Sequence, residues 1–320
     1  MLSRRDLLKS TLAAGAVGAV GSTVFVPLAA KAKAPLAGTQ APGYYRVMVG
    51  DVEVTALSDG AAQFPIADLY VNTTPEQARL ALANAFQGTP TYLSVNAYLL
   101  NFGDRLVLLD AGTSDLMGPA LGKLPANIVA SGYHPDQIDD VVITHIHPDH
   151  TGGLTLAGAK VFPNATVHVP EADKAFWLSA ENKANAPEDT KGFFDQAVAS
   201  IKPYEDSNTL QTYAPDEAAI AGKINSTFRP GHTPGHRALW SESNGEKFVY
   251  WGDITLAMLS SLTTRTSPLC LMAIPNWRSS RVKPHLPKQY RKNTLLLAAM
   301  SPSRALVTCG KTPPCMTGCQ

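Results

Sequence analysis

The stretch Thr144-His145-Ile146-His147-Pro148-Asp149-His150, which continues as Thr151-Gly152-Gly153, concentrates metal-ligating side chains in one place. In an extended segment, residues two apart point to the same side, so His145 and His147 can reach one ion together. Pro148 then turns the chain, and Asp149 and His150 can face a second ion. A polar turn with incidental histidines is the alternative interpretation. The spacing favours a metal site at the end of a strand.

The ligand atoms in this stretch are nitrogen and oxygen without sulfur, which suits zinc, manganese, iron or cobalt. The chain has 320 residues, 45% of them hydrophobic, enough to fill the core of one large domain or two ordinary ones. Its formal net charge of +1 gives no electrostatic reason to expect nucleic acid or an anionic membrane as a partner.

Residues 1–34 have the features of an export signal. Arg4 and Arg5 precede a mildly apolar run over residues 11–30 that is rich in Ala and Gly, and small residues suited to cleavage follow it. This arrangement resembles a twin-arginine signal. A membrane anchor is the alternative, but the glycines and Pro27 make the run weakly apolar. We therefore expect a periplasmic or secreted protein without membrane attachment after cleavage.

The rest of the chain alternates predicted strands with predicted helices. Apolar runs predict strands over residues 52–57, 93–100, 106–109, 141–144, 166–169 and 247–251. Thr74 is a helix cap, and the helix that it begins should bury Leu80, Leu82, Ala83 and Phe86. Shorter helical stretches are expected over residues 128–130, 172–180 and 192–201. The alternation indicates an α/β enzyme.

Two further motifs carry ligand-type residues. The loop Pro230-Gly231-His232-Thr233-Pro234-Gly235-His236 holds two histidines, and Gly252-Asp253 ends a predicted strand. The order H-x-H-x-D-H, then G-H-T-P-G-H, then strand-G-D resembles the metallo-β-lactamase superfamily. The resemblance implies an αββα sandwich over residues 35–255: two mixed sheets face to face, with helices outside and metals at one edge.

The resemblance also implies six ligands to two divalent ions, zinc first among the candidates: His145, His147 and His232 for the first ion, Asp149 and His150 for the second, and Asp253 between them. Asp149 and Asp253 would also be the catalytic carboxylates. Asp110 and His236 would orient ligands through hydrogen bonds, although direct ligation by His236 remains equally open.

Four flanking segments narrow the resemblance: residues 41–46, 57–60, 176–179 and 191–194 are similar to the methyl parathion hydrolases and related periplasmic organophosphate hydrolases and lactonases. This implies hydrolysis of organophosphate triesters by a metal-bridging hydroxide, with lactone or aryl ester hydrolysis as the alternative. The substrate would be a small-molecule ester, and a homodimer is expected. Met117, Trp177 and Phe194 would line an apolar pocket, with plain core packing as the other interpretation.

The composition changes abruptly after Asp253. All 26 acidic residues lie at or before it, whereas all 4 cysteines follow it. A basic tail for an anionic partner and an appendage with disulfides or a metal are two explanations. The third is a shifted reading frame close to Thr255. When the codons for residues 299–310 are read one base out of phase, permitted codon choices give H-V-S-F-P-G-I-G-H-V-R, which resembles the family segment with the last metal-binding histidine.

We hypothesise such a frameshift, which would make residues 256–320 aberrant and disrupt the end of the fold. Met300 then stands where the last ligand belongs, and a thioether suits such a site poorly. The chain as written would be a degenerate member with low stability and weak activity. Sequencing codons 250–260 should show a missing or extra base relative to close relatives, and one uninterrupted frame would contradict the hypothesis.

Overall fold

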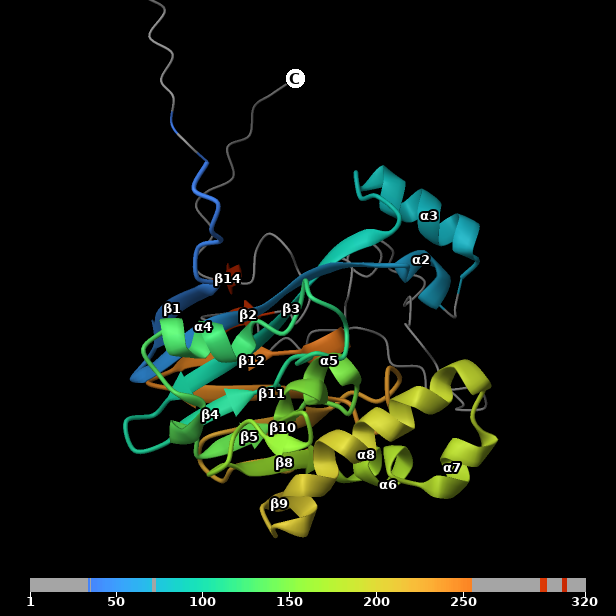
Figure 1. Cartoon of the computed structure of the whole chain (residues 1–320). Helices are drawn as coiled ribbons and strands as arrows, with labels where there is room; N and C mark the ends of the chain where they lie inside the picture. Colours follow the sequence, from blue (N-terminus) through green and yellow to red (C-terminus); the bar gives the residue numbers. More distant parts are fainter. Residues whose placement is uncertain (1–33, 35, 71–72, 255–293, 298–306, 310–320) are drawn as a thin grey trace, which may run out of the picture. The chain divides into compact units, whose positions relative to one another are not determined.

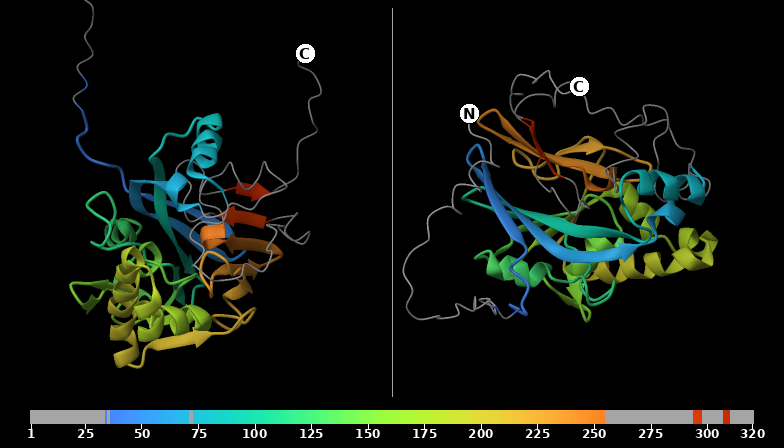
Figure 2. Two further views of the ribbon diagram at one scale, coloured as in Figure 1. Left: turned by 90° about the vertical axis from the view of Figure 1, so that its right-hand side faces the viewer. Right: turned by 90° about the horizontal axis from the view of Figure 1, so that it is seen from above.

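Two mixed β-sheets face each other in the compact unit formed by Ala41–Gln320 (Figures 1 and 2). The computed structural model describes residues 34, 36–70, 73–254, 294–297 and 307–309. The first sheet has seven strands in the order β1 (Tyr44–Val49), β2 (Val52–Phe64), β3 (Thr91–Asn101), β4 (Leu106–Leu109), β5 (Asp140–Val142), β8 (Thr166–Pro170) and β9 (Leu210–Tyr213). Neighbours are antiparallel from β1 to β4 and parallel from β4 to β9.

The second sheet has five strands in the order β10 (Asn225–Phe228), β11 (Arg237–Ser243), β12 (Glu246–Tyr250), β13 (Thr294–Leu297) and β14 (Val307–Cys309). Only the pairing of β12 with β13 is parallel. A small hairpin pairs β6 (Thr155–Leu156) with β7 (Ala159–Lys160). Short 3-10 turns are η1 (Pro135–Gln137), η2 (Gly152–Leu154), η3 (Glu188–Thr190) and η4 (Gly252–Ile254).

Aromatic side chains fill the space between the two sheets. Tyr98 of β3 lies 5.7 Å from Phe248 and 4.9 Å from Tyr250 of β12, measured between ring centroids. All three rings are fully buried, and large aromatic surfaces contribute strongly to core stability. The next residue of β3, Leu99, faces the opposite way into a second core under the helices. Strand β3 is covered on both faces, which explains its nearly continuous apolar sequence.

Helices cover the outer face of the first sheet. They are α4 (Leu124–Ala130), α5 (Pro148–Thr151), α6 (Glu171–Trp177), α7 (Ala180–Asn185) and α8 (Lys191–Asp206). Phe194, Ala197, Ile201 and Tyr204 form the buried stripe of α8, at the spacing of one helix face. Two more helices, α2 (Ile66–Leu69) and α3 (Pro75–Asn84), lie at the end of β2 and β3 (Figure 1). The predicted α/β sandwich of two mixed sheets is confirmed.

Two local predictions were wrong, the end of a strand and the buried face of a helix. Strand β2 continues past Ser58-Asp59-Gly60 to Phe64, because a bulge at Ser58/Gly60 absorbs the irregularity. Helix α3 begins at the Thr74 cap as predicted, but it buries Ala78 and Leu82. Leu80 is 63% exposed, Ala83 is exposed and Phe86 is fully exposed, because the helix contacts chiefly α2 rather than a sheet and ends before Phe86.

The segment after Asp253 also differs from expectation. Sequence patterning assigned it no element, yet β13 and β14 extend the second sheet. The apolar run Leu295-Leu296-Leu297 pairs with Phe248-Val249-Tyr250 of β12, which offers a free edge to any extended apolar segment. The predicted signal and the proposed ligand position at Met300 lie outside the described residues. In the part of the chain that the structure describes, no helix has the length and apolarity needed to cross a membrane.

Arg237 of β11 is a fully buried cation. Its guanidinium lies 4.5 Å from the ring of Phe228 and 5.8 Å from that of Tyr213. Among the described residues, none of its three nitrogens has a hydrogen-bond partner. Burial lowers the pKa of Arg237, and the two rings offset only part of the desolvation cost.

Replacing Arg237 with methionine should therefore stabilise the protein. We expect the Arg237→Met variant to gain about 1 kcal/mol or more in free energy of unfolding, because an unpaired buried charge is removed. Urea unfolding followed by circular dichroism measures this. Arg237→Lys keeps the buried charge and serves as the control, with no gain expected. A loss of stability in Arg237→Met would show that the guanidinium has a strong partner.

Candidate metal centre

The predicted ligands come from loops of both sheets that meet at one edge. Strand β5 ends at Val142, and His145 and His147 follow it before α5 begins at Pro148. His232 lies in the loop between β10 and β11, and Asp253 lies in the turn that follows β12. The parallel pairing of β4, β5 and β8 brings their carboxyl ends to this edge, where α/β proteins usually place their sites.

Three histidines converge on one point. The Nε2 atom of His145 lies 3.2 Å from Nδ1 of His147 and 3.1 Å from Nε2 of His232. Nitrogens that bind one tetrahedral zinc at 2.0–2.1 Å are about 3.3 Å apart, so this spacing fits a single ion. Burial and the neighbouring histidines hold the pKa values of His145 and His147 well below their usual range. Their imidazoles are neutral at neutral pH, as metal ligands must be.

A second group forms around His150. Its Nε2 lies 3.4 Å from Oδ2 of Asp149 and 3.4 Å from Oδ1 of Asp253. His150 Nε2 and Asp253 Oδ1 are buried and have no hydrogen-bond partner among the described atoms. Two such orphaned ligand atoms, facing each other without a bond, fit a shared ion. His145, His147 and His232 form one candidate ligand trio, and His145, His150 and Asp253 form another.

The carboxylate of Asp253 lies between the two groups. Its Oδ2 is 3.4 Å from Nε2 of His232 and 3.9 Å from that of His145, whereas Oδ1 faces His150. Burial alone would raise the pKa of Asp253, but the charge of His150 and contacts to His150 and His232 hold it well below its usual range. The carboxylate is therefore ionised, which suits a position between two cations.

An ion that binds at the His150 group must displace a proton from His150. Burial alone lowers the pKa of His150, but Asp149, Asp253 and Asp110 together raise it well above its usual value. Without ions, a protonated His150 balances these carboxylates. Ion binding at this group therefore releases a proton from His150, as expected where cations and protons compete for one ligand.

Asp110 fixes the orientation of both groups. Its Oδ2 accepts a hydrogen bond from Nδ1 of His150 at 2.6 Å, which leaves Nε2 of that ring free to ligate. The same oxygen accepts the hydroxyl of Thr144 at 2.9 Å, and that hydroxyl lies 3.0 Å from Nδ1 of His145. Because Thr144 donates its proton to Asp110, its oxygen accepts from His145, and Nε2 of His145 also remains a ligand atom.

His236 contacts the backbone of Asp253. Its Nε2 accepts the Asp253 N–H at 3.0 Å, and its ring is fully buried. Burial lowers the pKa of His236 to about 3, so the ring is a neutral acceptor. Gly252 has a φ of 58°, and a Cβ there would lie 2.8 Å from His236 Nε2, so only glycine permits this contact. The geometry favours the orienting role of His236 over direct ligation.

Sequence analysis missed several residues that hold the site. Asp59 is fully buried and accepts hydrogen bonds from the backbone of Thr113, Gly122 and Leu124, so it braces the loop that follows Asp110. The hydroxyl of Tyr250 donates to Asp110 Oδ2 at 2.6 Å. These partners are distant in sequence and carry no motif. Asp59 lies in the flanking segment Leu57-Ser58-Asp59-Gly60. Its only signal in the sequence is an acidic residue within a strand.

The three predicted pocket residues pack against two different cores in the described structure. Trp177 is 4% exposed and Phe194 is 3% exposed, and their rings pack 4.8 Å apart in the core under the helices. Met117 packs against the other core, between the sheets. Trp177 also lies 5.3 Å from the ring of His147, which makes it a neighbour of the three-histidine group. The pocket role of these residues stays a prediction.

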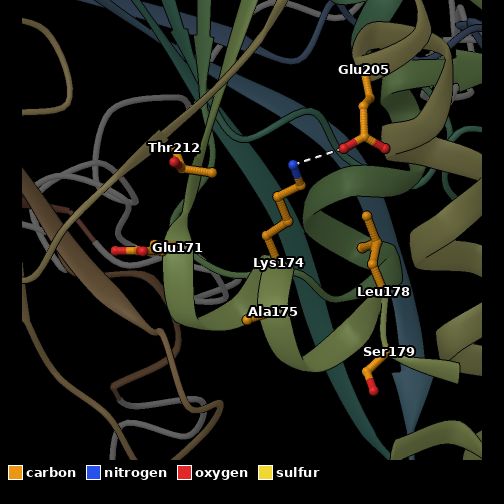
Figure 3. Close-up of a pocket in the computed structure, with 7 residues that line it drawn as sticks. All are labelled: Glu171, Lys174, Ala175, Leu178, Ser179, Glu205 and Thr212. Atoms are coloured by element: carbon orange, nitrogen blue, oxygen red, sulfur yellow. Dashed lines mark ion pairs between the residues drawn. The ribbon is translucent and has the colours of Figure 1, made fainter. Parts of the chain in front are cut away.

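A separate hollow of about 530 Å³ lies between α6, α8 and β9 (Figure 3). Its lining includes Glu171, Lys174 and Leu178 of α6, Glu205 of α8 and Thr212 of β9. Lys174 and Glu205 form an ion pair at 2.8 Å across it. None of the predicted ligands or pocket residues lines this hollow. It is a surface hollow distinct from the metal centre.

Comparison with known proteins assigns the family. Residues 90–287 match the metallo-β-lactamase superfamily profile. The chain belongs to this superfamily. The donors of the centre suit divalent metal ions. Residues 1–21 match the twin-arginine translocation signal, so the protein is exported to the periplasm or secreted.

Sequence relatives cover part of the chain. A ribonuclease from Thermus thermophilus is 28% identical over 176 residues, which are 52% of this chain and 36% of the ribonuclease. The N-acyl homoserine lactonase AttM from Rhizobium radiobacter is 30% identical over 136 residues, which are 40% of this chain and 46% of AttM. The matched region therefore spans less than half of each of these curated relatives.

Solved structures share the fold more completely. The hydrolase AbOPH of the β-lactamase superfamily has a TM-score of 0.70 at 29% identity, over 84% of this chain and 94% of AbOPH. AidC, a dizinc quorum-quenching lactonase, has a TM-score of 0.68 at 21% identity, over 85% of this chain and 95% of AidC. The finer resemblance to methyl parathion hydrolases stays a prediction.

Replacing Asp110 with asparagine should weaken ion binding at the His150 group about 10- to 100-fold, because the acceptor that orients His150 is lost. Isothermal titration of the metal-free chain with zinc measures this. Asp140→Asn is the matched control, since Asp140 is also buried and contacts His168 Nε2 at 2.7 Å, away from the metal centre. Equal losses in both variants would contradict the assigned role of Asp110.

Proposed function

We propose that the protein is a hydrolase of small organophosphate triesters that uses two divalent metal ions. The observation that carries this proposal is the carboxylate of Asp253, because one oxygen faces the three-histidine group and the other faces His150. Two ligand groups that share a carboxylate can hold two ions side by side, as in enzymes that displace a group from phosphorus or a carbonyl carbon. Zinc suits these donors, as do manganese, iron and cobalt.

When bound, the ions would supply a hydroxide nucleophile at neutral pH and would polarise the P=O or C=O bond. The chain holds neutral imidazoles at His145 and His147 and an ionised carboxylate at Asp253. Asp149 is the more accessible carboxylate, with 12% of its side chain exposed compared with 3% for Asp253. We assign the catalytic carboxylate role to Asp149 and Asp253 together.

Aromatic residues beside the three-histidine group support an aryl-bearing substrate. Trp177 lies 5.3 Å and Phe193 lies 6.2 Å from the ring of His147. Phe193 is only half-buried, so part of its ring is available to a ligand. Aromatic leaving groups pack well on such rings. A phenolate also needs little proton donation when it departs, so the reaction does not depend on a strong general acid.

Lactone or aryl ester hydrolysis is the second candidate. It is supported by the 30% identity to the lactonase AttM over 136 residues. A carbonyl ester and a phosphotriester make the same demands on this centre: a nucleophile held near two cations and stabilisation of a developing oxyanion. The metal centre itself favours neither substrate class, whereas the aromatic rings beside His147 favour a substrate with an aryl group over an aliphatic lactone.

A metal-binding member without activity is the third candidate. The His150 group offers His150, Asp149 and Asp253 within the described residues. The proposed frameshift would remove a further ligand at Met300 and lower the affinity for the second ion. One bound ion or none would favour this candidate, and two bound ions would favour an active enzyme.

Activity assays with the zinc-loaded full chain compare the candidates. We expect nitrophenol release from methyl parathion to exceed ring opening of an N-acyl homoserine lactone. His150→Ala should lower either rate at least about 100-fold, since an ion contributes several kcal/mol at the transition state. His134→Ala is the control, because His134 is exposed and lies outside the centre. Faster lactone opening would establish the second candidate, and two bound ions without either reaction would exclude the first two.

A further inference from the structure

Asp173 connects the two loops that carry the three-histidine group. It lies in the first turn of α6 and is fully buried. Its Oδ2 accepts the backbone N–H of Ile146 at 2.8 Å and the hydroxyl of Thr233 at 2.8 Å. Its Oδ1 accepts the backbone N–H of Gly235. One carboxylate therefore satisfies three donors from two segments that are far apart in the sequence.

The donors are next to the predicted ligands. Ile146 lies between His145 and His147, and its buried side chain packs in the core under the helices. Thr233 directly follows His232. A hydrogen bond to the Ile146 N–H fixes the peptide that sets the directions of both neighbouring imidazoles. The bond to Thr233 fixes the base of the third imidazole relative to the same carboxylate, so Asp173 sets the spacing of the trio.

The close packing around Gly235 shows that this contact is built into the loop. A Cβ at Gly235 would lie 2.6 Å from the backbone nitrogen of Asp173 and 2.7 Å from its Oδ1. Any larger residue would push the loop away from α6. The segment Gly231-His232-Thr233-Pro234-Gly235 therefore carries the predicted ligand His232 and also requires glycine at its end for steric reasons.

The backbones of the two loops are also linked directly, because the N–H of Arg237 donates to the carbonyl of Thr144 at 3.0 Å. This link joins residues that flank the ligands rather than the ligand-bearing peptides. Burial raises the pKa of Asp173, and the three donors oppose that shift. Without the carboxylate, the buried N–H groups of Ile146 and Gly235 would lose their acceptor, and the His232 loop would be free to move.

We propose that Asp173 is a positioning residue that holds His145, His147 and His232 at the spacing one ion requires. This proposal deepens the proposed function and rests on its metal centre, but it does not depend on which ester is cleaved. Preorganisation of ligands by such outer contacts commonly changes metal affinity 10- to 100-fold.

Cobalt(II) binding to the metal-free full chain tests the proposal, because the visible spectrum of cobalt reports coordination geometry directly. We expect Asp173→Asn to weaken cobalt binding at the three-histidine group about 10- to 100-fold and to change the spectrum. An amide of the same size presents N–H groups to donors, so it cannot accept all three bonds. Thr233→Val removes one bond only and should weaken binding by a smaller factor.

Asp140→Asn is the control, because it removes a buried carboxylate whose contacts, to His168 and Arg105, include no predicted ligand. It should leave cobalt affinity and spectrum unchanged even if it lowers the unfolding midpoint. Wild-type affinity and spectrum in Asp173→Asn would overturn the proposal, as would an equal loss in Asp140→Asn. If Asp173→Asn does not fold, an unchanged spectrum and affinity in Thr233→Val would overturn it instead. Failure of both ester assays with normal cobalt binding would reject the proposed function alone.

Discussion

The carboxylate of Asp110 is the interaction on which the metal centre depends. It accepts hydrogen bonds from the backbone and hydroxyl of Thr144, from His150 and from Tyr250. Thr144 and His150 follow β5 of the first sheet, in the loop after it and in α5, whereas Tyr250 belongs to the second sheet. Asp110 itself has a φ of 59°, an uncommon conformation for a residue other than glycine. This one strained residue therefore links the two sheets and fixes the orientations of two imidazole rings.

The two sheets and the centre support each other through this residue. Tyr250 packs against Tyr98 between the sheets and places its hydroxyl on Asp110. Three residues further along the chain, Asp253 reaches His145 and His150, which follow β5 of the first sheet. A slip of β12 by one residue would turn Tyr250 away from the core and would move Asp253 out of the site. The register of β12 therefore determines core packing and ligand geometry together.

The predicted ligands stand in short sequence motifs, and the structure brings them together. His145 and His147 follow the period of an extended chain, and the resemblance supplied His232 and Asp253. Sequence reasoning missed Asp173 and Asp59, because they support the site through hydrogen bonds to segments distant in the sequence. Apolar residues such as Trp177 pose a different difficulty, since a core residue and a pocket residue look alike in sequence. Leu80 was misassigned because α3 contacts chiefly α2 rather than a sheet.

Because the ligands come from distant segments of the chain, the centre can assemble only late in folding. His145 to His150 leave the ribosome long before Asp253, so the early part of the chain offers an incomplete set of donors. The complete set exists only after the second sheet has folded onto the first. The twin-arginine pathway carries proteins that are already folded, and the signal directs the chain to that pathway. Ions bound at the proposed centre would consequently be selected by what the cytoplasm supplies during folding, not by the metals present where the protein finally works.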